Sequence, residues 1–270
     1  MKTILIGILL LFVVNSGVGQ EKDVTELTSQ LQGTENGHLV IAGSDEDIHE
    51  SGGLEGIEKI FQRYGFINIQ TLHTRDPLLA NTKQFTEPIQ QATGLWFTGG
   101  RQWRLADAYL HTRTHDEILK LLERGGVVGG SSAGASIMGS YLVRGDTKTN
   151  VVMMGDHEEG LGLLTNCAID QHLLALNRQF DLLEILKAHP DILGIGLDEN
   201  TAIVVHNNEF EVIGKSYVAI YDGTVCKFIR DQADWSVERP EISKLPVGSE
   251  RFYLLDKGRK YSLKERRVLE

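Results

Sequence analysis

Hydrophobic and polar positions follow one another along the chain in blocks that predict strands and helices in turn. Short apolar runs predict buried strands, and apolar residues at helical spacing predict the helices between them. The predicted strands are HLVIAG (38–43), FINIQTL (66–72), TGLWFTGG (93–100), GVVGG (126–130), LLTNCAID (163–170) and ILGIGLD (192–198). The predicted helices cover 54–66, 104–126, 133–143 and 180–190.

Strands that are apolar on both faces and alternate with helices are typical of a parallel sheet covered on both sides. The pattern changes at Thr201, where TAIVVHNNEFEVIG (201–214) has two strand-like runs around Asn207-Asn208, a hairpin signal. Two later runs, 216–223 and 251–258, are similar. We therefore predict an α/β fold. It is a doubly wound, mostly parallel sheet with helices on both faces and an antiparallel C-terminal extension, in one domain over 38–270.

The first residues, MKTILIGILLLFVVNSGVGQ, have the order of a secretory signal peptide: a basic start, an apolar stretch and small residues. The apolar stretch of about twelve residues is shorter than the roughly 20 that span a bilayer. An uncleaved membrane anchor is the alternative. We predict a signal peptide over 1–19, a polar N-terminal arm over 20–37, and export to the periplasm or the cell exterior, with no membrane span after cleavage.

The formal charge of −10 becomes −11 when a signal peptide removes Lys2 and no acid. An acidic protein lacks the basic patch that nucleic acid requires, so a nucleic-acid partner is not expected. The same charge would attract a cationic substrate. The chain has two cysteines, Cys167 and Cys226, too few for a disulfide framework. One bridge and two separate thiols both remain open.

The segment GGVVGGSSAGASIMGS (125–140) contains the motif G-x-S-x-G at 130–134, between a predicted strand and a predicted helix. In a nucleophile elbow of this kind, the serine sits on a strained turn with its hydroxyl exposed. The amide of Ala133 could then donate to a developing oxyanion. A turn whose small residues only allow close packing is the alternative, and glycine-rich turns also bind phosphates. The motif makes Ser132 a candidate nucleophile.

A serine nucleophile needs a base and a group that orients the base. Ligand sites in parallel sheets form beyond the carboxyl ends of strands, and two candidates stand there: His172 after the strand 163–170, and Glu199 after the strand 192–198. The histidine precedes the acid along the chain, which differs from the order in lipase-type esterases. A glutamine amidotransferase reaction needs a cysteine where Ser132 stands.

Other polar groupings favour structural interpretations. His111 and His115 are four residues apart on a predicted helix and could clasp a metal, but the glutamate of H-E-x-x-H is absent, so a solvated face is favoured. The cluster Asp156–Glu159 is interpreted as a surface loop. The sequence has neither a P-loop nor a dinucleotide fingerprint. No metal and no cofactor are therefore expected.

Four segments together resemble cyanophycinase, a relative of peptidase E among serine peptidases whose fold is similar to class I glutamine amidotransferases. They are GSSAGA (130–135), FTGGRQWRL (97–105), GLGLL with IDQH (160–172) and GIGLDENTAIVV (194–205). The resemblance runs in order from about residue 38 to residue 223. It favours a catalytic Ser132 far more strongly than the elbow motif alone.

The resemblance implies a role for each matching position. Ser132 matches the nucleophile, His172 the base and Glu199 the orienting acid, with Asp198 as the neighbour of next interest. Gly100 and Ala133 match the oxyanion donors. The positions that line the substrate pocket are Gln102, Asp170, Gln171 and Arg178.

The chain also departs from the family pattern. After D-Q-H the family carries several arginines that contact substrate, whereas here only Arg178 fits, and Leu176 and Asp181 stand where arginine is expected. The stretch GSDED (43–47) replaces a usual glycine pair. We expect a secreted serine peptidase that hydrolyses β-Asp-Arg type peptides or a cyanophycin-like polymer, with a homodimer as one assembly to test. The alternatives are a peptidase E-like hydrolase of other aspartyl peptides and a degenerate peptide-binding member.

Overall fold

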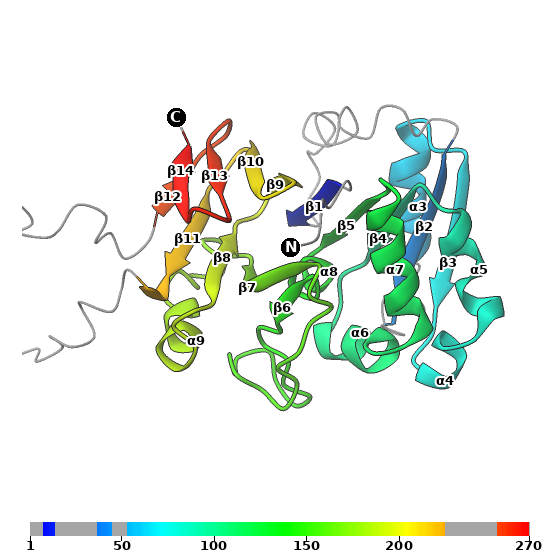
Figure 1. The fold of residues 1–270 in the computed structure, drawn as a ribbon, viewed down its shortest axis with the longest axis horizontal. Coiled ribbons are helices and arrows are strands. Elements are labelled where there is room, and N and C mark those ends of the chain that lie inside the picture. Colours follow the sequence, from blue (N-terminus) through cyan, green and yellow to red (C-terminus); the bar gives the residue numbers. More distant parts are fainter. Residues whose placement is uncertain (1–7, 14–36, 45–52, 225–252, 270) are drawn as a thin grey trace, which may run out of the picture.

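Two β-sheets form the framework of the protein in the computed structural model, which describes residues 8–13, 37–44, 53–224 and 253–269 (Figure 1). The first sheet has the strand order β14 (Arg267–Leu269), β13 (Lys260–Ser262), β10 (Glu209–Gly214), β9 (Thr201–His206), β1 (Ile8–Val13), β5 (Val127–Ser131), β4 (Gly94–Phe97), β2 (His38–Gly43), β3 (Asn68–His73). The second has the order β12 (Tyr253–Leu255), β11 (Val218–Asp222), β8 (Leu193–Leu197), β7 (Leu164–Gln171), β6 (Gly139–Tyr141).

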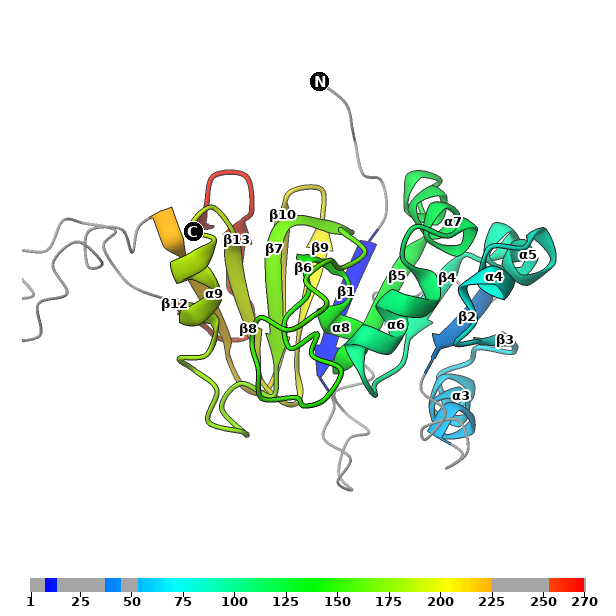
Figure 2. The ribbon, with the colours of Figure 1, turned by 90° about the horizontal axis from the view of Figure 1, so that it is seen from below.

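The parallel half of the first sheet carries helices on both faces. Strands β3, β2, β4 and β5 pair in parallel. Helix α3 (Gly53–Arg63) covers one face, where Phe61 packs against Trp96 of β4. The helices of the other face are α4 (Pro77–Ala80), α5 (Lys83–Gln91), α6 (Gln102–Tyr109) and α7 (Arg113–Glu123) (Figure 2). The carboxyl ends of the parallel strands thus meet at one edge, as ligand sites in such sheets require.

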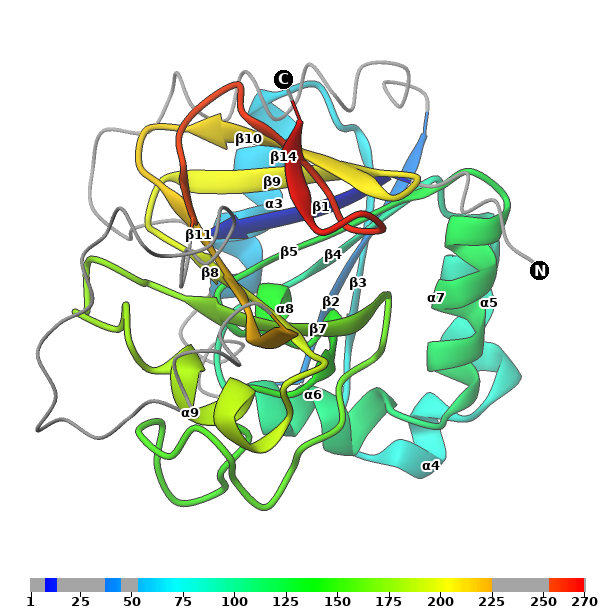
Figure 3. The same ribbon diagram turned by 60° about the vertical axis from the view of Figure 1, so that its left-hand side comes forward.

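The first strand of the second sheet, β6, follows the turn that carries Ser132 after one short helix. Helix α8 (Ala133–Ser136) is a single turn that contacts both β5 and β7 and lies between the two sheets (Figure 3). One core runs through both sheets and includes Phe97 of β4, Ile137 after α8 and Ile195 of β8. Helix α9 (Leu182–Ala188) covers the far face of the second sheet. The shared core fixes the ends of β5, β7 and β8 relative to one another.

The α/β fold with a parallel sheet, helices on both faces and an antiparallel C-terminal part is confirmed. The hairpin β9–β10 turns at Asn207 and Asn208, and Asn207 has the left-handed φ of 57° that such turns use. The single predicted sheet is in fact two. Strands β9, β10, β13 and β14 extend the first sheet, whereas β11 and β12 extend the second. Apolar runs predict that strands are buried but not which sheet each joins.

Strand β1 comes from the residues predicted to form a signal peptide. Ile8–Val13 pairs in parallel with β5 and antiparallel with β9. A short apolar run suits a buried strand and the centre of a signal peptide equally well, so the pattern does not separate the two. Cleavage after residue 19 stays a prediction. The arm over 20–37 lies almost wholly outside the described residues. Within the described part of the chain, no helix has the length and apolar character needed to cross a membrane.

The structure differs from the predicted elements at three places. The helix expected over 104–126 is two helices, α6 and α7, because the chain turns at His111, whose φ is 58°. The helix expected over 133–143 ends after one turn and leads into β6. Helices α4 and α5 were not predicted, although Asp76 and Thr82 accept hydrogen bonds from Leu78 and Phe85 as side-chain caps.

Candidate active site

Ser132 lies on the tight turn between β5 and α8. Its backbone has φ 55° and ψ −118°, a conformation that a residue with a side chain rarely adopts. The glycines on either side are required by close backbone contacts. A Cβ at Gly130 would stand 2.4 Å from the carbonyl oxygen of Gly134, and a Cβ at Gly134 would stand 2.4 Å from that of Phe97. The turn therefore has the strained geometry of a nucleophile elbow.

His172 and Glu199 complete a hydrogen-bonded chain with Ser132. The Oγ of Ser132 is 3.1 Å from Nε2 of His172, and Nδ1 of His172 is 3.0 Å from Oε1 of Glu199. His172 follows β7 with a left-handed φ of 57°, and Glu199 follows β8. The His172 and Glu199 side chains are 21% and 19% exposed, so both are partly open to solvent. The fold thus brings three residues from three separate strand ends into one line.

Asp198, the neighbour of Glu199, has a different position. Its carboxylate accepts hydrogen bonds from the backbone amides of Leu174 and Ala175, at 2.9 and 3.0 Å, and from the hydroxyl of Ser216. These bonds fix the turn that follows His172. Asp198 therefore supports the segment after the histidine, and Glu199 is the acid that contacts the imidazole.

The turn after β4 lies beside Ser132. A Cβ at Gly99 would stand 3.5 Å from the Cβ of Ser132, and the next residue, Gly100, has a left-handed φ of 113°. The amide of Ala133 follows Ser132 directly in the chain, at the first residue of α8. The two predicted oxyanion donors, Gly100 and Ala133, thus belong to the two segments that flank the serine. Their roles stay predictions.

The four residues predicted to line the substrate pocket have partners inside the protein. Gln102 is 2% exposed and donates from Nε2 to the carbonyl of Val143 at 2.8 Å. Asp170 is fully buried, and Gln171 is 5% exposed. Arg178 donates from Nη1 to the backbone and side-chain oxygens of Gln171, both at 3.0 Å. Contact of these four side chains with substrate stays a prediction.

Arg144 is the main partner of Asp170, and the sequence pattern did not single it out. Its Nε and Nη2 donate to the two carboxylate oxygens of Asp170, both at 3.0 Å. Nη2 also donates to Asp181 at 2.5 Å. Burial of the guanidinium opposes its charge, but the hydrogen bonds to Asp170 and Asp181 outweigh burial and raise the pKa of Arg144. Asp181, which stands where the resemblance predicts an arginine, is therefore the partner of an arginine from another segment.

Three other histidines make contacts between the loop 142–163, which joins β6 to β7, and the region of α6 and α7; His157 belongs to the loop itself. His111 Nε2 lies 3.1 Å from Glu159, and His115 Nε2 lies 2.8 Å from the carbonyl of Leu161. His157 lies 2.8 Å from Asp107 of α6. The predicted helix-face pair His111 and His115 thus fixes a loop. Among the described residues, no three histidine, cysteine or acidic side chains are grouped as metal ligands would be.

Cys167 is a free thiol in β7, and burial raises its pKa to about 12. Such a thiol is inert at neutral pH. Cys226 lies outside the described residues.

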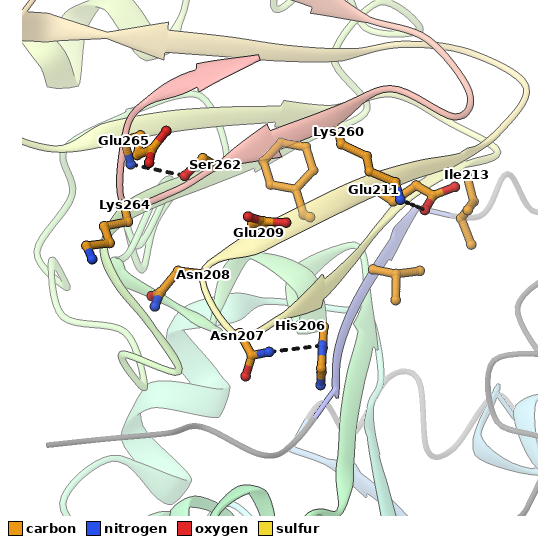
Figure 4. A pocket seen from close by; sticks show the side chains of 12 residues that line it. His206, Asn207, Asn208, Glu209, Glu211, Ile213, Lys260, Ser262, Lys264 and Glu265 are labelled. Carbon is orange, nitrogen blue, oxygen red and sulfur yellow. Dashed lines mark hydrogen bonds and ion pairs between the residues drawn. The ribbon is translucent and has the colours of Figure 1, made fainter. Parts of the chain in front are cut away.

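A groove of about 730 Å³ lies on the hairpin β9–β10 and β13 (Figure 4). Its lining includes Glu209, Glu211 and Lys260, and none of the residues that line it is Ser132, His172 or Glu199. The groove is therefore separate from the hydrogen-bonded chain described above.

Comparison with known proteins supports the family resemblance. The model of the family "Peptidase family S51" matches residues 24–213. A cyanophycinase of Geminocystis herdmanii is 33% identical over 210 residues, which cover 76% of this chain and 75% of the relative. A cyanophycinase of Trichormus variabilis is 32% identical over 216 residues, which cover 78% of this chain and 70% of the relative.

Two solved structures have a similar fold. A peptidase from an acI-B1 Actinobacterium superposes with a TM-score of 0.64 at 21% identity, covering 95% of this chain and 96% of that chain. A putative peptidase E from Listeria monocytogenes superposes with a TM-score of 0.56 at 18% identity, covering 78% of this chain and 99% of that chain. These two likenesses support the fold.

Proposed function

Because the chain belongs to peptidase family S51, we propose that it is a serine peptidase that cleaves aspartyl peptides through Ser132, His172 and Glu199. The observation that carries this proposal is the unbroken line of hydrogen bonds from the Ser132 hydroxyl through the imidazole to Glu199. Serine becomes a nucleophile when a base takes its proton and a third group holds the base in the correct tautomer.

The proposed reaction has two stages. Ser132 Oγ attacks the carbonyl carbon of the scissile amide while His172 Nε2 takes the hydroxyl proton, and Glu199 stabilises the imidazolium. The amides of Gly100 and Ala133 bind the tetrahedral oxygen. The C–N bond then breaks, the amine leaves with the proton from His172, and an ester on Ser132 remains. Water, deprotonated by His172, hydrolyses the ester and restores the enzyme.

The proposed substrates are β-aspartyl peptides, with arginine as a modestly preferred branch. The two cyanophycinases named above are the relatives that suggest this class. Asp170 and Asp181, the two acids near the site that would otherwise be available to a basic branch, are both paired with Arg144. Leu176 and Phe180 of the same segment are 54% and 61% exposed. These observations favour tolerance of other aspartyl peptides, which is the second candidate function.

Hydrolysis of matched peptides by the purified protein tests this proposal. The panel contains β-aspartyl peptides with arginine, lysine or leucine as the branch, their α-linked isomers, and cyanophycin, with products identified by mass. We expect cleavage of the β-linked peptides. The kcat/KM of the peptide with an arginine branch should exceed that of the peptide with a leucine branch by no more than about tenfold, a difference of 1.4 kcal/mol. Equal rates for all branches would rule out the preference for arginine, and no cleavage of any β-linked peptide would contradict the proposed substrate class.

The pH dependence of the same hydrolysis tests the role of His172. The imidazole must be neutral to accept the Ser132 proton, so activity is expected to rise with pH from the acidic side. A flat profile from about pH 5 to 8 would contradict the role of the histidine.

Export is a further part of the proposal, supported by the order of residues 1–19. We propose that cleavage leaves a mature chain that starts near Gln20. N-terminal sequencing of protein recovered from outside the cytosol tests this, and an intact Met1 would contradict cleavage. Gel filtration of the same material tests whether the chain forms a homodimer.

A further inference from the structure

Arg144 lies where the loop after β6 passes between the two arms of the site. One arm is the turn after β4, which carries Gly100 and reaches the loop through the hydrogen bond from Gln102 to the Val143 carbonyl. The other arm is the end of β7, which carries His172 and reaches the loop through Asp170. Adjacent residues, Val143 and Arg144, therefore contact both arms.

Arg144 donates hydrogen bonds from all three nitrogens of its guanidinium, to partners other than Ser132 and His172. The residue is 3% exposed. Besides Asp170 and Asp181, its Nη1 donates to the carbonyls of Asn150 and Val151 at 3.0 and 3.4 Å. A planar guanidinium can make this set of bonds at once, whereas the single ammonium of lysine cannot.

The backbone of Arg144 is a second, independent observation. Its φ is 56°, in the left-handed region that side chains other than glycine rarely occupy. Such strain persists only where the surroundings hold it in place, and it clusters at functional sites. The hydrogen bonds of the side chain and the 3.0 Å bond from its own amide to the Met153 carbonyl hold it here.

Asp170 transmits the position of Arg144 to the base. The Oδ1 of Asp170 accepts a hydrogen bond from the backbone amide of Gln171 at 3.0 Å, and Gln171 immediately precedes His172. Loss of the guanidinium would leave a fully buried carboxylate without its main partner, two residues before the base. Movement of that strand end would change the 3.1 Å contact between His172 and Ser132.

We propose that Arg144 is a positioning residue that locks the turn carrying Gly100 and the strand end carrying His172 into one arrangement. The inference concerns the same site and rests on the proposed function. It assigns Arg144 no contact with substrate. It predicts that weakening the guanidinium contacts loosens both arms and slows the reaction of Ser132, beyond any effect on overall stability.

The test compares Arg144→Lys with the matched variant Arg266→Lys. Arg266 pairs at 2.9 Å with Asp222, another carboxylate that is only 3% exposed. Asp222 pairs in register with Leu193, at the opposite end of β8 from Glu199. Lysine keeps the charge and is chosen because Arg144→Met removes the partner of a buried acid and could fail to fold. Two readouts are measured on the folded full chain: the rate at which a fluorophosphonate labels Ser132, and hydrogen exchange of the segments 98–105 and 168–181.

Arg144→Lys is expected to slow labelling by about tenfold to a hundredfold, the range that a small misplacement of catalytic groups produces. Exchange is expected to quicken in both segments and to stay unchanged in α7. Arg266→Lys is expected to change neither readout. Labelling at the wild-type rate, or unchanged exchange in either segment, would overturn the proposal. If the wild-type serine does not label at all, the proposed function fails, and exchange alone then decides whether Arg144 joins the two arms.

Discussion

The strain at Ser132 is matched by two glycines whose missing side chains make room for the turn. A Cβ at Gly134 would stand 2.4 Å from the carbonyl oxygen of Phe97. Because closely packed backbone atoms cannot move without a cost in free energy, a side chain at this position is unfavourable. The glycines of the elbow motif are therefore explained both by close packing and by the strained backbone of Ser132. The sequence raised these as competing interpretations, and the geometry accommodates both.

Gly134→Ala is expected to destabilise the protein by about 1 to 3 kcal/mol through overpacking. It should also reduce activity, because relief of the clash must move β4 or α8. The matched control is Gly56→Ala in helix α3, where nothing lies within 4 Å of the new methyl group. That variant is expected to gain about 0.5 to 1 kcal/mol from helix propensity. Urea unfolding of both variants measures the difference, and equal stabilities would contradict the role given to Gly134.

Individual residues were predictable from sequence where a motif and a strand end coincided. Ser132 follows from G-x-S-x-G, and His172 and Glu199 follow from their places after apolar runs. Asp198 and Glu199 looked alike in sequence, and only their hydrogen bonds separate them. The role of Arg144 could not be predicted from the sequence, because its partners Asp170 and Asp181 are distant in sequence and only the fold brings the three together.

At the scale of elements, the loop 142–163 is fixed to α6 by a charged contact. His157 Nε2 lies 2.8 Å from Asp107, and Nδ1 lies 3.3 Å from Asp156. Partial burial opposes protonation of His157, but the hydrogen bonds to the two carboxylates outweigh it and raise its pKa. A raised pKa stabilises the fold at pH values below the ordinary pKa of about 6.5. This contribution is lost as pH rises through the value in the folded protein.

His157→Gln is therefore expected to lower the melting temperature at pH 5 to 6 by a few degrees at most, because both acids are half exposed. The gap to the wild type should shrink as the pH approaches about 8. His206→Gln serves as the control, since its Nδ1 lies 3.2 Å from the side-chain amide of Asn207 and the described residues form no ion pair with it. A gap that widens with rising pH would contradict the ion-pair explanation.

Elements were predicted well where the apolar pattern was long and poorly where a local turn decided the outcome. The interruption at His111 falls inside a continuous helical pattern, so a single helix was expected there. The capped helices α4 and α5 are short and contain Pro77 and Pro88, which hide the helical period. Strands β13 and β14 have three residues each, too few for a period to show.

At the scale of the whole molecule, two sheets meet at α8 and place the ends of β5, β7 and β8 together. The alternation of strands and helices sufficed to predict the α/β class and the edge at which the site forms. The division into two sheets could not be predicted, because it depends on the register and the pairing of distant strands. The place of β1 was likewise hidden, since an apolar run suits a strand and a signal peptide equally.

The proposed chemistry depends on this meeting of strand ends, since no single segment supplies more than one member of the hydrogen-bonded chain. Ser132 comes after β5, His172 after β7 and Glu199 after β8. Substitution of Ser132 by alanine is expected to reduce turnover by about 10⁶ while leaving substrate binding largely intact. Turnover close to that of the wild type would contradict a serine mechanism.

The most direct test of the account is to trap the covalent intermediate. The wild-type protein is mixed with a β-aspartyl peptide and quenched in acid within the first turnover. The protein is then digested, and the masses of its peptides are measured by mass spectrometry. The account predicts that the peptide containing Ser132 gains the mass of the aspartyl acyl group, and that the same peptide from Ser132→Ala gains nothing. Rapid turnover with the acyl group on a residue other than Ser132 would contradict it.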